Sequence, residues 1–362
     1  MKSIKGVDKM KSIIDVDKNF QTKNFKTDGK TAFYTIPSAP FDLYGITYLN
    51  DEKRFARLPE NLVKDYPGLD FLRKHTSGGR IRFSTDSDFL TLTIDYPTLG
   101  QMKHMPSTGI SGFSLLEESN GKEPFLIANF CPEPHETNLH PYVQTIALPK
   151  GKRNYVLYFP LYQAVNSLTI GVNANAYIGH GLSYKPDLPI LYYGSSITQG
   201  GCATRPDLSY QAMISKWTNV DFINMGFSGN AKGEQFMAEY LSNIPCSVFV
   251  IDYDHNAPNP QHLKDTHSNF YKIFREKNPL TPVIFVTKPD VEYDVDAKKR
   301  VNIIKNTYLK AKSKGENVYF INGKSLYGKA DRNMFAVDGC HPNDLGFYKM
   351  AKRILKELNK IR

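Results

Sequence analysis

The stretch Ile190-Leu191-Tyr192-Tyr193-Gly194-Ser195-Ser196-Ile197-Thr198-Gln199-Gly200-Gly201 carries the pattern that decides the fold. It begins with a continuous apolar run, and a glycine followed by small hydroxyl residues then opens a short segment. Strands that are apolar on both faces are typical of a parallel sheet covered by helices. The stretch therefore predicts the first strand and turn of an α/β domain.

The same alternation of apolar runs and helical segments continues to the end of the chain. The later apolar runs are Val220–Asn224, Val248–Asp252, Val283–Thr287 and Val318–Ile321. The segments with helical spacing are Tyr210–Trp217, Gln235–Leu241, Leu263–Glu276, Ala297–Lys312 and Leu345–Leu358. This order predicts a three-layer α/β/α domain with a parallel sheet over residues 187–362.

The residues before this domain follow a period of two. The clearest alternating runs are Arg80–Thr85, Phe89–Ile94, Asn154–Phe159 and Ser167–Val172. Many short alternating runs separated by turn residues predict an antiparallel β-sandwich, jelly-roll-like in character, over residues 31–184. Residues 1–30 are polar and rich in lysine, and we expect them to form a loosely ordered arm.

Composition excludes several classes of protein. The 362 residues include 22 Phe and 22 Tyr, enough aromatic side chains for a real core, so intrinsic disorder is excluded for most of the chain. No apolar run approaches the roughly 20 residues of a membrane helix. No signal-peptide pattern precedes residue 31, so we expect a cytoplasmic protein. A periplasmic or secreted location is the alternative if a signal has been removed.

Charge and cysteine spacing point to neither a nucleic-acid partner nor a metal. The net charge of +10 is spread thinly outside the first thirty residues, which favours a solvated surface over nucleic-acid binding. The four cysteines are far apart, without a CxxC pair, and no HExxH motif is present. The spacing therefore specifies neither a disulfide scaffold nor a metal site.

Polar segments follow the apolar runs, where ligands bind in open α/β sheets. They are Gly194–Gly201, Asn224–Asn230 and Asp252–Asn256, and a further one, Asp338–Asn343, precedes the last helical segment. We expect all four to gather at one edge of the sheet. A serine on the first turn is a candidate nucleophile, because helix N-H groups stabilise developing negative charge. A phosphate-binding loop is a weaker interpretation, since the Gly-Lys-Ser/Thr ending is absent, and a plain turn remains an alternative.

The other segments contain the remaining parts of an acyl-transfer site. Asp338 and His341 are three residues apart, so a carboxylate can orient an imidazole base. The alternative for this pair is a capped helix start with Pro342 in its first turn. Gly229 can offer a backbone N-H and Asn256 an amide to an oxyanion, although each also suits an ordinary turn.

Taken together, these segments resemble the four blocks of the SGNH, or GDSL-type, hydrolases. Gly194-Ser195-Ser196-Ile197-Thr198 is similar to the Gly-Asp-Ser-x-Thr block, with Ser196 in the nucleophile position. The resemblance implies that His341 is the base, that Asp338 orients it, and that Ser196, Gly229 and Asn256 form the oxyanion hole. The third block departs from the usual Gly-x-Asn-Asp, which leaves Asp254 and His255 as substitutes for Asn256.

The first domain resembles the β-sandwich of a bacterial branch named for a Gly-x-Asp-Leu-Tyr motif. Gly112-Phe113-Ser114-Leu115-Leu116 keeps the Gly and the first Leu of that motif. The resemblance implies a flavodoxin-like catalytic domain and a serine esterase that needs no metal or organic cofactor. The expected substrate is a small O-acyl ester, with acetyl as the acyl group and a carbohydrate as the alcohol.

Two other functions remain open at this point. One is a lipase, lysophospholipase or thioesterase of the same fold, and the other is a catalytically silent carbohydrate-binding protein. Further candidates for substrate contact are Thr198, Asn230, Lys232 and His255.

Overall fold

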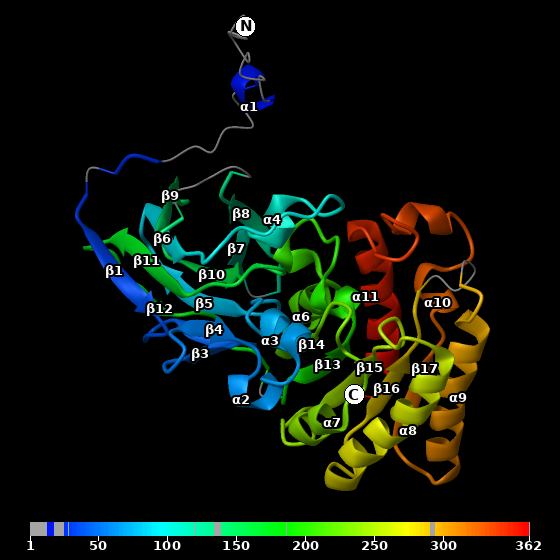
Figure 1. Cartoon of the computed structure of the whole chain (residues 1–362). Helices are drawn as coiled ribbons and strands as arrows, with labels where there is room; N and C mark the ends of the chain where they lie inside the picture. Colours follow the sequence, from blue (N-terminus) through cyan, green and yellow to red (C-terminus); the bar gives the residue numbers. More distant parts are fainter. Residues whose placement is uncertain are drawn as a thin grey trace, which may run out of the picture.

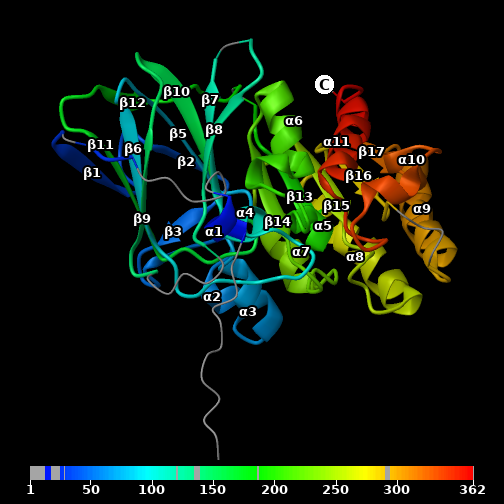
Figure 2. The ribbon, with the colours of Figure 1, turned by 90° about the horizontal axis from the view of Figure 1, so that it is seen from above.

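The structure is a computed structural model that describes residues 13–17, 25–27, 29–119, 121–133, 139–185, 187–289 and 294–361. The expected N-terminal arm, residues 1–30, lies largely outside this range. An antiparallel β domain and an α/β domain lie side by side (Figure 1), and the view from above shows the same arrangement (Figure 2). No helix in the described residues is long and apolar enough to cross a membrane.

The N-terminal domain is built from two antiparallel sheets. The first has the order β1 (Thr31–Ile36), β11 (Ser167–Asn173), β6 (Phe89–Asp95) and β9 (Tyr142–Ala147). The second has the order β12 (Ile178–His180), β5 (Arg80–Thr85), β10 (Arg153–Tyr158), β7 (Phe113–Glu118) and β8 (Phe125–Phe130), with β2 (Asp42–Tyr44) also paired to β5. Phe83 of β5 and Leu92 of β6 belong to one buried apolar cluster between the sheets. The predicted antiparallel sandwich is confirmed.

Several short elements interrupt the sandwich, and the sequence pattern did not predict them. They are the hairpin β3 (Thr47–Leu49) and β4 (Arg54–Ala56), and the helices α2 (Glu60–Val63), α3 (Pro67–Arg73) and α4 (Ser107–Ile110). A separate short helix, α1 (Ile13–Val16), lies near the N-terminus.

The C-terminal domain has a five-stranded parallel sheet. Its order is β14 (Phe222–Gly226), β13 (Ile190–Gly194), β15 (Val248–Asp252), β16 (Val283–Val286) and β17 (Val318–Ile321). This 2-1-3-4-5 order is that of flavodoxin-like folds, so the expected topology is confirmed. β14 begins two residues later than predicted, because Asn219 ends the preceding helix in a left-handed conformation and the Asp221 carboxylate accepts from the Phe222 N-H.

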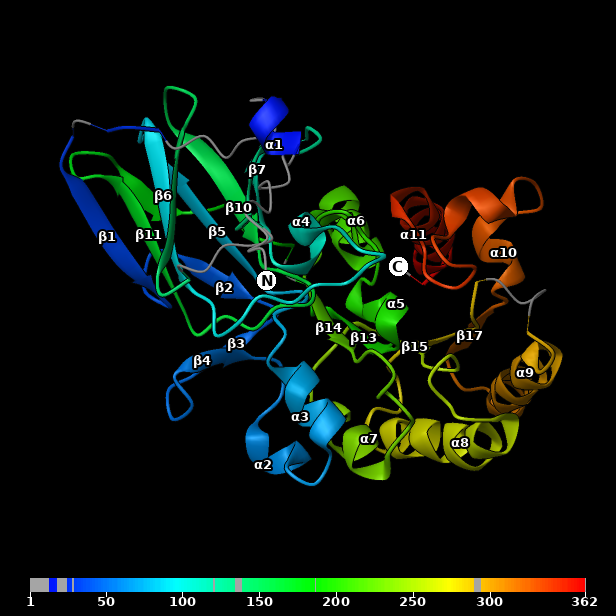
Figure 3. The same cartoon turned by 45° about the horizontal axis from the view of Figure 1, so that its top comes forward.

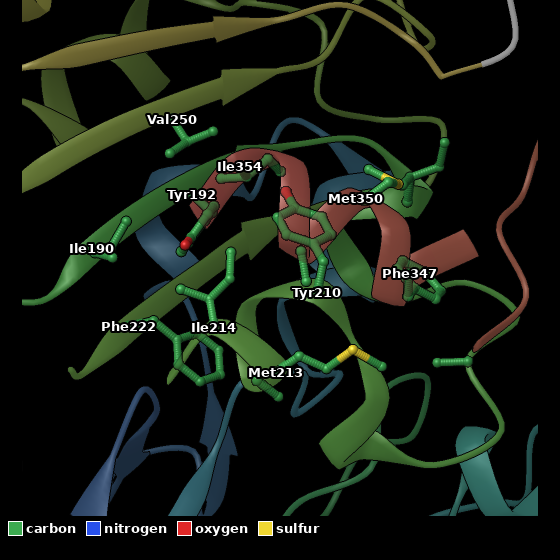
Figure 4. Packing of buried hydrophobic residues seen from close by; sticks show 14 of the residues in the cluster. Ile190, Tyr192, Tyr210, Met213, Ile214, Phe222, Val250, Phe347, Met350 and Ile354 are labelled. Carbon is green, nitrogen blue, oxygen red and sulfur yellow. The ribbon is translucent and has the colours of Figure 1, made fainter. Parts of the chain in front are cut away.

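Helices cover both faces of this sheet (Figure 3). One face carries α6 (Tyr210–Thr218), α10 (Lys324–Tyr327) and α11 (Asp344–Leu358). The other carries α7 (Gln235–Leu241), α8 (Pro260–Lys277) and α9 (Ala297–Ser313). Short helical turns complete the domain: α5 (Ser196–Gln199), η2 (Pro206–Leu208) and η3 (Arg332–Phe335). Tyr192 of β13 packs edge-on against Tyr210 of α6, and Phe347, Met350 and Ile354 of α11 lie in the same core (Figure 4).

Strand β5 of the sandwich lies at the interface between the two domains. Every residue of β5 is buried, because its outward face packs on the α/β domain instead of facing water. Arg80 pairs with Asp221 and lies 3.9 Å over the ring of Phe222. Arg82 donates to Glu118 at 2.7 Å and to the Asn219 side chain at 3.0 Å. The interface is therefore buried and polar, and it fixes how the sandwich sits against β14.

Candidate active site

The turn after β13 places two serines at the start of α5. Ser195 is the N-cap residue, and its Oγ accepts a hydrogen bond from the Ile197 N-H at 3.2 Å. The Ser195 N-H donates to the carbonyl of Asp252 at the end of β15. Ser196 is the first residue of the helix and is only 9% exposed. Its hydroxyl is thus held at the carboxyl edge of the sheet.

Ser196, His341 and Asp338 form a continuous hydrogen-bonded chain. Ser196 Oγ lies 2.8 Å from His341 Nε2, and His341 Nδ1 lies 2.8 Å from Asp338 Oδ2. The backbone N-H of His341 also donates to Asp338 Oδ1, at 2.7 Å. The loop that carries the last two residues comes just before α11, so two segments 145 residues apart in sequence meet here.

The ionisation of Asp338 fixes the tautomer of His341. Partial burial alone would raise the pKa of Asp338, but hydrogen bonds from the His341 backbone and imidazole outweigh it and hold the pKa at about 2. An ionised carboxylate can only accept, so His341 Nδ1 carries the hydrogen. The lone pair of the neutral imidazole is therefore on Nε2, where it accepts the Ser196 hydroxyl proton.

Two backbone N-H groups from the segments that carry the site lack a hydrogen-bond acceptor among the described residues. Among the described residues, the N-H groups of Ser196 and Gly229 donate to no acceptor. Gly229 has φ +68, in the left-handed region that favours glycine, and a Cβ there would meet nothing within 4 Å. Asn256 Nδ2 donates to the Phe227 carbonyl at 2.8 Å, which ties this amide to the loop of Gly229 and leaves its second N-H for another acceptor.

Asp254 and His255 were the alternatives to Asn256 in the sequence analysis. In the structure, both side chains have contacts that differ from those of Asn256. Asp254 is buried, and its Oδ2 accepts from the Lys288 N-H at 3.1 Å. Burial raises the pKa of Asp254 to about 6. Burial, reinforced by the nearby charge of Lys288, keeps the pKa of His255 well below its usual value, so its imidazole is neutral. His255 Nδ1 lies 3.5 Å from Cys340 Sγ.

The structure corrects one candidate for substrate contact and separates two others from the triad. Thr198 is fully buried, and its Oγ1 donates to Asp252 Oδ2, so a substrate cannot reach it. Asn230 and Lys232 line a cavity of about 380 Å³ with Tyr66 and His262, and no triad residue lines that cavity. The turn pattern suggested these contacts because sequence does not reveal which way each side chain points.

Residues of the sandwich support this site, and sequence analysis did not identify them. Gln199 Nε2 lies 3.1 Å from His75 Nδ1, and Gln199 Oε1 accepts from the Ser228 N-H at 2.9 Å. Burial, together with the charge of Arg57, lowers the pKa of His75 to about 3, so its imidazole is neutral and accepts from Gln199. The first domain thereby fixes Ser228, the residue before Gly229.

The same loop of the sandwich approaches β14 closely. Ser77 Oγ donates to the Gln199 carbonyl at 2.6 Å, and Asn224 Nδ2 donates to Ser77 Oγ at 3.1 Å. Gly78 has φ +87, and a Cβ at this position would lie 2.7 Å from the Asn224 Cβ. Only glycine lets the two backbones come this close. The only indication in the sequence was the turn pattern Ser77-Gly78-Gly79, and this pattern does not reveal which segment the turn contacts.

Arg57 is a buried cation placed behind the loop of Gly229. Its guanidinium donates to the carbonyls of Leu72 and His75 in its own domain, at 2.7 and 2.8 Å. It also donates to the Gly226 carbonyl at 2.5 Å and lies 4.5 Å from the centre of the Phe227 ring. Burial lowers the pKa of Arg57 to about 9, which leaves the group charged at neutral pH. Carbonyl dipoles and an aromatic ring stabilise this charge.

We expect Arg57→Ala to lower the free energy of unfolding by about 3 kcal/mol or more, because it removes a buried side chain and its charged hydrogen bonds to buried carbonyls of both domains. Arg54 is the matched control: it is partly exposed, and among the described residues its side chain forms no hydrogen bond. Arg54→Ala should change the free energy of unfolding by less than about 0.5 kcal/mol. Urea unfolding, followed by the fluorescence of the single tryptophan, measures both variants. Equal effects would contradict the role assigned to Arg57.

Comparison with known proteins agrees with this arrangement. Residues 187–359 match the GDSL-like lipase/acylhydrolase family, and residues 31–178 match the GxDLY family, described as the N-terminus of Esterase_SGNH_hydro-type. No curated protein matches the chain.

Solved structures share the whole two-domain arrangement. A protein described as a GDSL-like lipase from Bacteroides ovatus ATCC 8483 is 28% identical, with a TM-score of 0.80 over 92% of this chain and 98% of that one. The salicylyl-acyltransferase SsfX3 from a tetracycline biosynthetic pathway is 17% identical, with a TM-score of 0.75 over 91% and 97%. A family two carbohydrate esterase from Clostridium thermocellum, in complex with cellohexaose, is 13% identical, with a TM-score of 0.61 over 88% and 98%.

The two family matches together span most of the chain and meet at the boundary between the sandwich and the parallel sheet. The chain therefore belongs to the GDSL-like lipase/acylhydrolase family, carries the N-terminal domain of SGNH-type esterases, and is a carboxylic ester hydrolase.

Proposed function

We propose that the protein is a serine esterase that removes small acyl groups, above all acetyl, from a carbohydrate. The observation that carries the proposal is the chain of two 2.8 Å contacts from Ser196 through His341 to Asp338. A catalytically silent binding protein would not need an oriented base beside a buried serine. The chemistry follows from these residues alone.

Ser196 Oγ attacks the ester carbonyl while His341 Nε2 takes the hydroxyl proton. Asp338, which stays ionised, holds the imidazole and stabilises the imidazolium. The N-H groups of Ser196 and Gly229 and the remaining amide N-H of Asn256 stabilise the tetrahedral oxyanion. His341 then protonates the leaving alcohol, and water, activated by the same base, releases the acyl group from Ser196.

The surroundings of the triad support a small acyl group. The rings of His104 and His341 have centroids 5.8 Å apart, and His255 and Asn256 come just after the carboxyl end of β15. Polar groups of this kind bind a hydrated alcohol well, whereas a long acyl chain needs an apolar groove. The carbohydrate esterase of Clostridium thermocellum, which shares the fold, supports a sugar as the alcohol.

A panel of esters tests the substrate class. We expect hydrolysis of p-nitrophenyl acetate to exceed that of the octanoate by at least about tenfold in kcat/KM, because each added methylene must find space in a polar site. Acetate release from acetylated oligosaccharides should also be measurable. Ser196→Ala protein, prepared in the same way, serves as the blank.

The other outcomes distinguish the alternatives. Preference for the octanoate without sugar deacetylation would indicate a lipase or thioesterase. No hydrolysis of any ester above the Ser196→Ala blank would indicate a binding protein.

A further inference from the structure

Three side chains of types that can bind metal ions lie close together beside the triad, and the sequence spacing did not indicate this cluster. They are His104, Cys202 and His341, and one ligand atom from each lies within 4.8 Å of the other two. They come from three distant segments: a loop of the sandwich, the turn after α5, and the loop before α11. Motif searches cannot find such a set, because only the packing of the two domains brings it together.

The available atom of His341 is defined by the triad. Its Nδ1 is held by Asp338 at 2.8 Å, so the nitrogen left for a metal is Nε2. This is the atom that lies 2.8 Å from Ser196 Oγ. A metal and the serine proton therefore compete for one lone pair.

Cys202 has a backbone that a non-glycine residue seldom adopts. Its φ is +74, whereas glycine alone takes this conformation without strain. It follows Gly200 and Gly201, and a Cβ at Gly201 would lie 3.3 Å from His341 Cδ2, so the turn passes directly beside the imidazole. All four cysteines lie in the described part of the chain, and no disulfide links them, so the Cys202 sulfur is not consumed by a cross-link.

His104 closes the site from the other domain. It lies between Met102 and Met105, whose backbones pair across a tight turn. Its ring is partly exposed and lies 5.8 Å, centre to centre, from that of His341. A metal ion can therefore enter from solvent past two partly exposed imidazoles, although Cys202 itself is buried.

We propose that His104, Cys202 and His341 bind a zinc ion reversibly, and that the bound ion switches the esterase off. Zinc binds imidazole nitrogen and thiolate sulfur, and a site with three protein ligands keeps a fourth position for water. Tetrahedral zinc needs ligand atoms about 3.3 to 3.7 Å apart. The ligand atoms now lie within 4.8 Å of one another, so zinc binding requires the three side chains to move closer together. Binding releases the Cys202 thiol proton to solvent and occupies the Nε2 lone pair, so His341 no longer accepts the proton of Ser196.

Inhibition rests on the proposed function, whereas binding does not, so the two are measured separately. Cobalt(II) replaces zinc as a spectroscopic probe: the wild-type protein should show the visible bands of tetrahedral cobalt and a thiolate-to-cobalt charge-transfer band. Esterase activity is measured in parallel with added zinc chloride, and then again after EDTA. We expect half-inhibition in the micromolar range and full recovery with the chelator.

Variants of the two ligands outside the triad decide the assignment. Cys202→Ser should keep basal hydrolysis but need at least about tenfold more zinc for half-inhibition. His104→Gln is measured by cobalt binding instead of by activity, and it should need at least about tenfold more cobalt to reach half of the visible absorbance. Cys202→Ser should also lose the thiolate band. Cys246→Ser, a second buried thiol in the apolar core, is the matched control and should behave as wild type.

Three results would overturn the proposal. The first is a cobalt spectrum of the wild-type protein that remains the spectrum of the hydrated ion. This result would exclude binding at the site whether or not the protein hydrolyses esters. The second is unchanged zinc sensitivity in Cys202→Ser together with unchanged cobalt affinity in His104→Gln. The third is loss of sensitivity in Cys340→Ser but not in Cys202→Ser, which would assign the metal to the neighbouring thiol.

Discussion

Ser196→Ala should lower kcat for ester hydrolysis by roughly 10⁶-fold, as removal of the nucleophile does in other triad enzymes. The Ser196 hydroxyl is the group that lies 2.8 Å from His341 Nε2, and alanine leaves the base without a proton to take. The substitution removes one oxygen from a helix N-terminus, so the fold should be unchanged. Initial rates with p-nitrophenyl acetate, together with circular dichroism of the variant, measure both parts of this expectation.

The adjacent serine is the matched control. Ser195 Oγ accepts from the Ile197 N-H and serves as the N-cap of α5, so Ser195→Ala should cost about 1 kcal/mol of stability. Its hydroxyl makes no contact with His341 among the described residues, and kcat should stay within about tenfold of wild type. If Ser195→Ala abolished hydrolysis and Ser196→Ala did not, the nucleophile would be Ser195.

The α/β domain could be predicted almost element by element from the sequence. Its strands are buried on both faces, so each one appears as a continuous apolar run, and β15 and β17 have the predicted bounds. The pair Asp338 and His341 could also be predicted, because two residues three positions apart on one loop lie close together locally. That Ser196 meets this pair was inferred from the carboxyl-edge rule and the family resemblance.

Contacts between the domains could not be predicted. Arg57, His75 and Ser77 gain their roles only when the sandwich packs on β14 and α5, and nothing in their own segments names those partners. The alternating pattern of β5 likewise did not reveal that its second face is buried. Side-chain direction was the other gap, since Thr198 follows the nucleophile closely in sequence yet points into the core.

Asp338→Asn should lower kcat by about 10⁴-fold with KM nearly unchanged, because the interaction it removes matters most when His341 is charged. The Asn amide can donate to Nδ1, which moves the imidazole hydrogen to Nε2 and points a donor at the serine hydroxyl. Asp331→Asn is the matched control: this exposed aspartate has φ +55, a conformation that Asn also tolerates, and its rate should stay within about twofold of wild type. Steady-state kinetics on both variants, with the same acetyl ester, measure the difference.

The pH dependence of the free energy of unfolding provides a second test of the role of the Asp338 carboxylate. The pKa of Asp338 is about 2 in the folded protein, below the ordinary value of 3.8, so its ionised form stabilises the fold at neutral pH. That contribution is complete above about pH 4 and is lost as pH falls through about 2. Since the carboxylate is partly exposed, solvent screening keeps the contribution modest. Urea unfolding between pH 2 and pH 5 should therefore lose more stability on acidification in wild type than in Asp338→Asn, and equal slopes would show that Asp338 does not hold His341 through its charge.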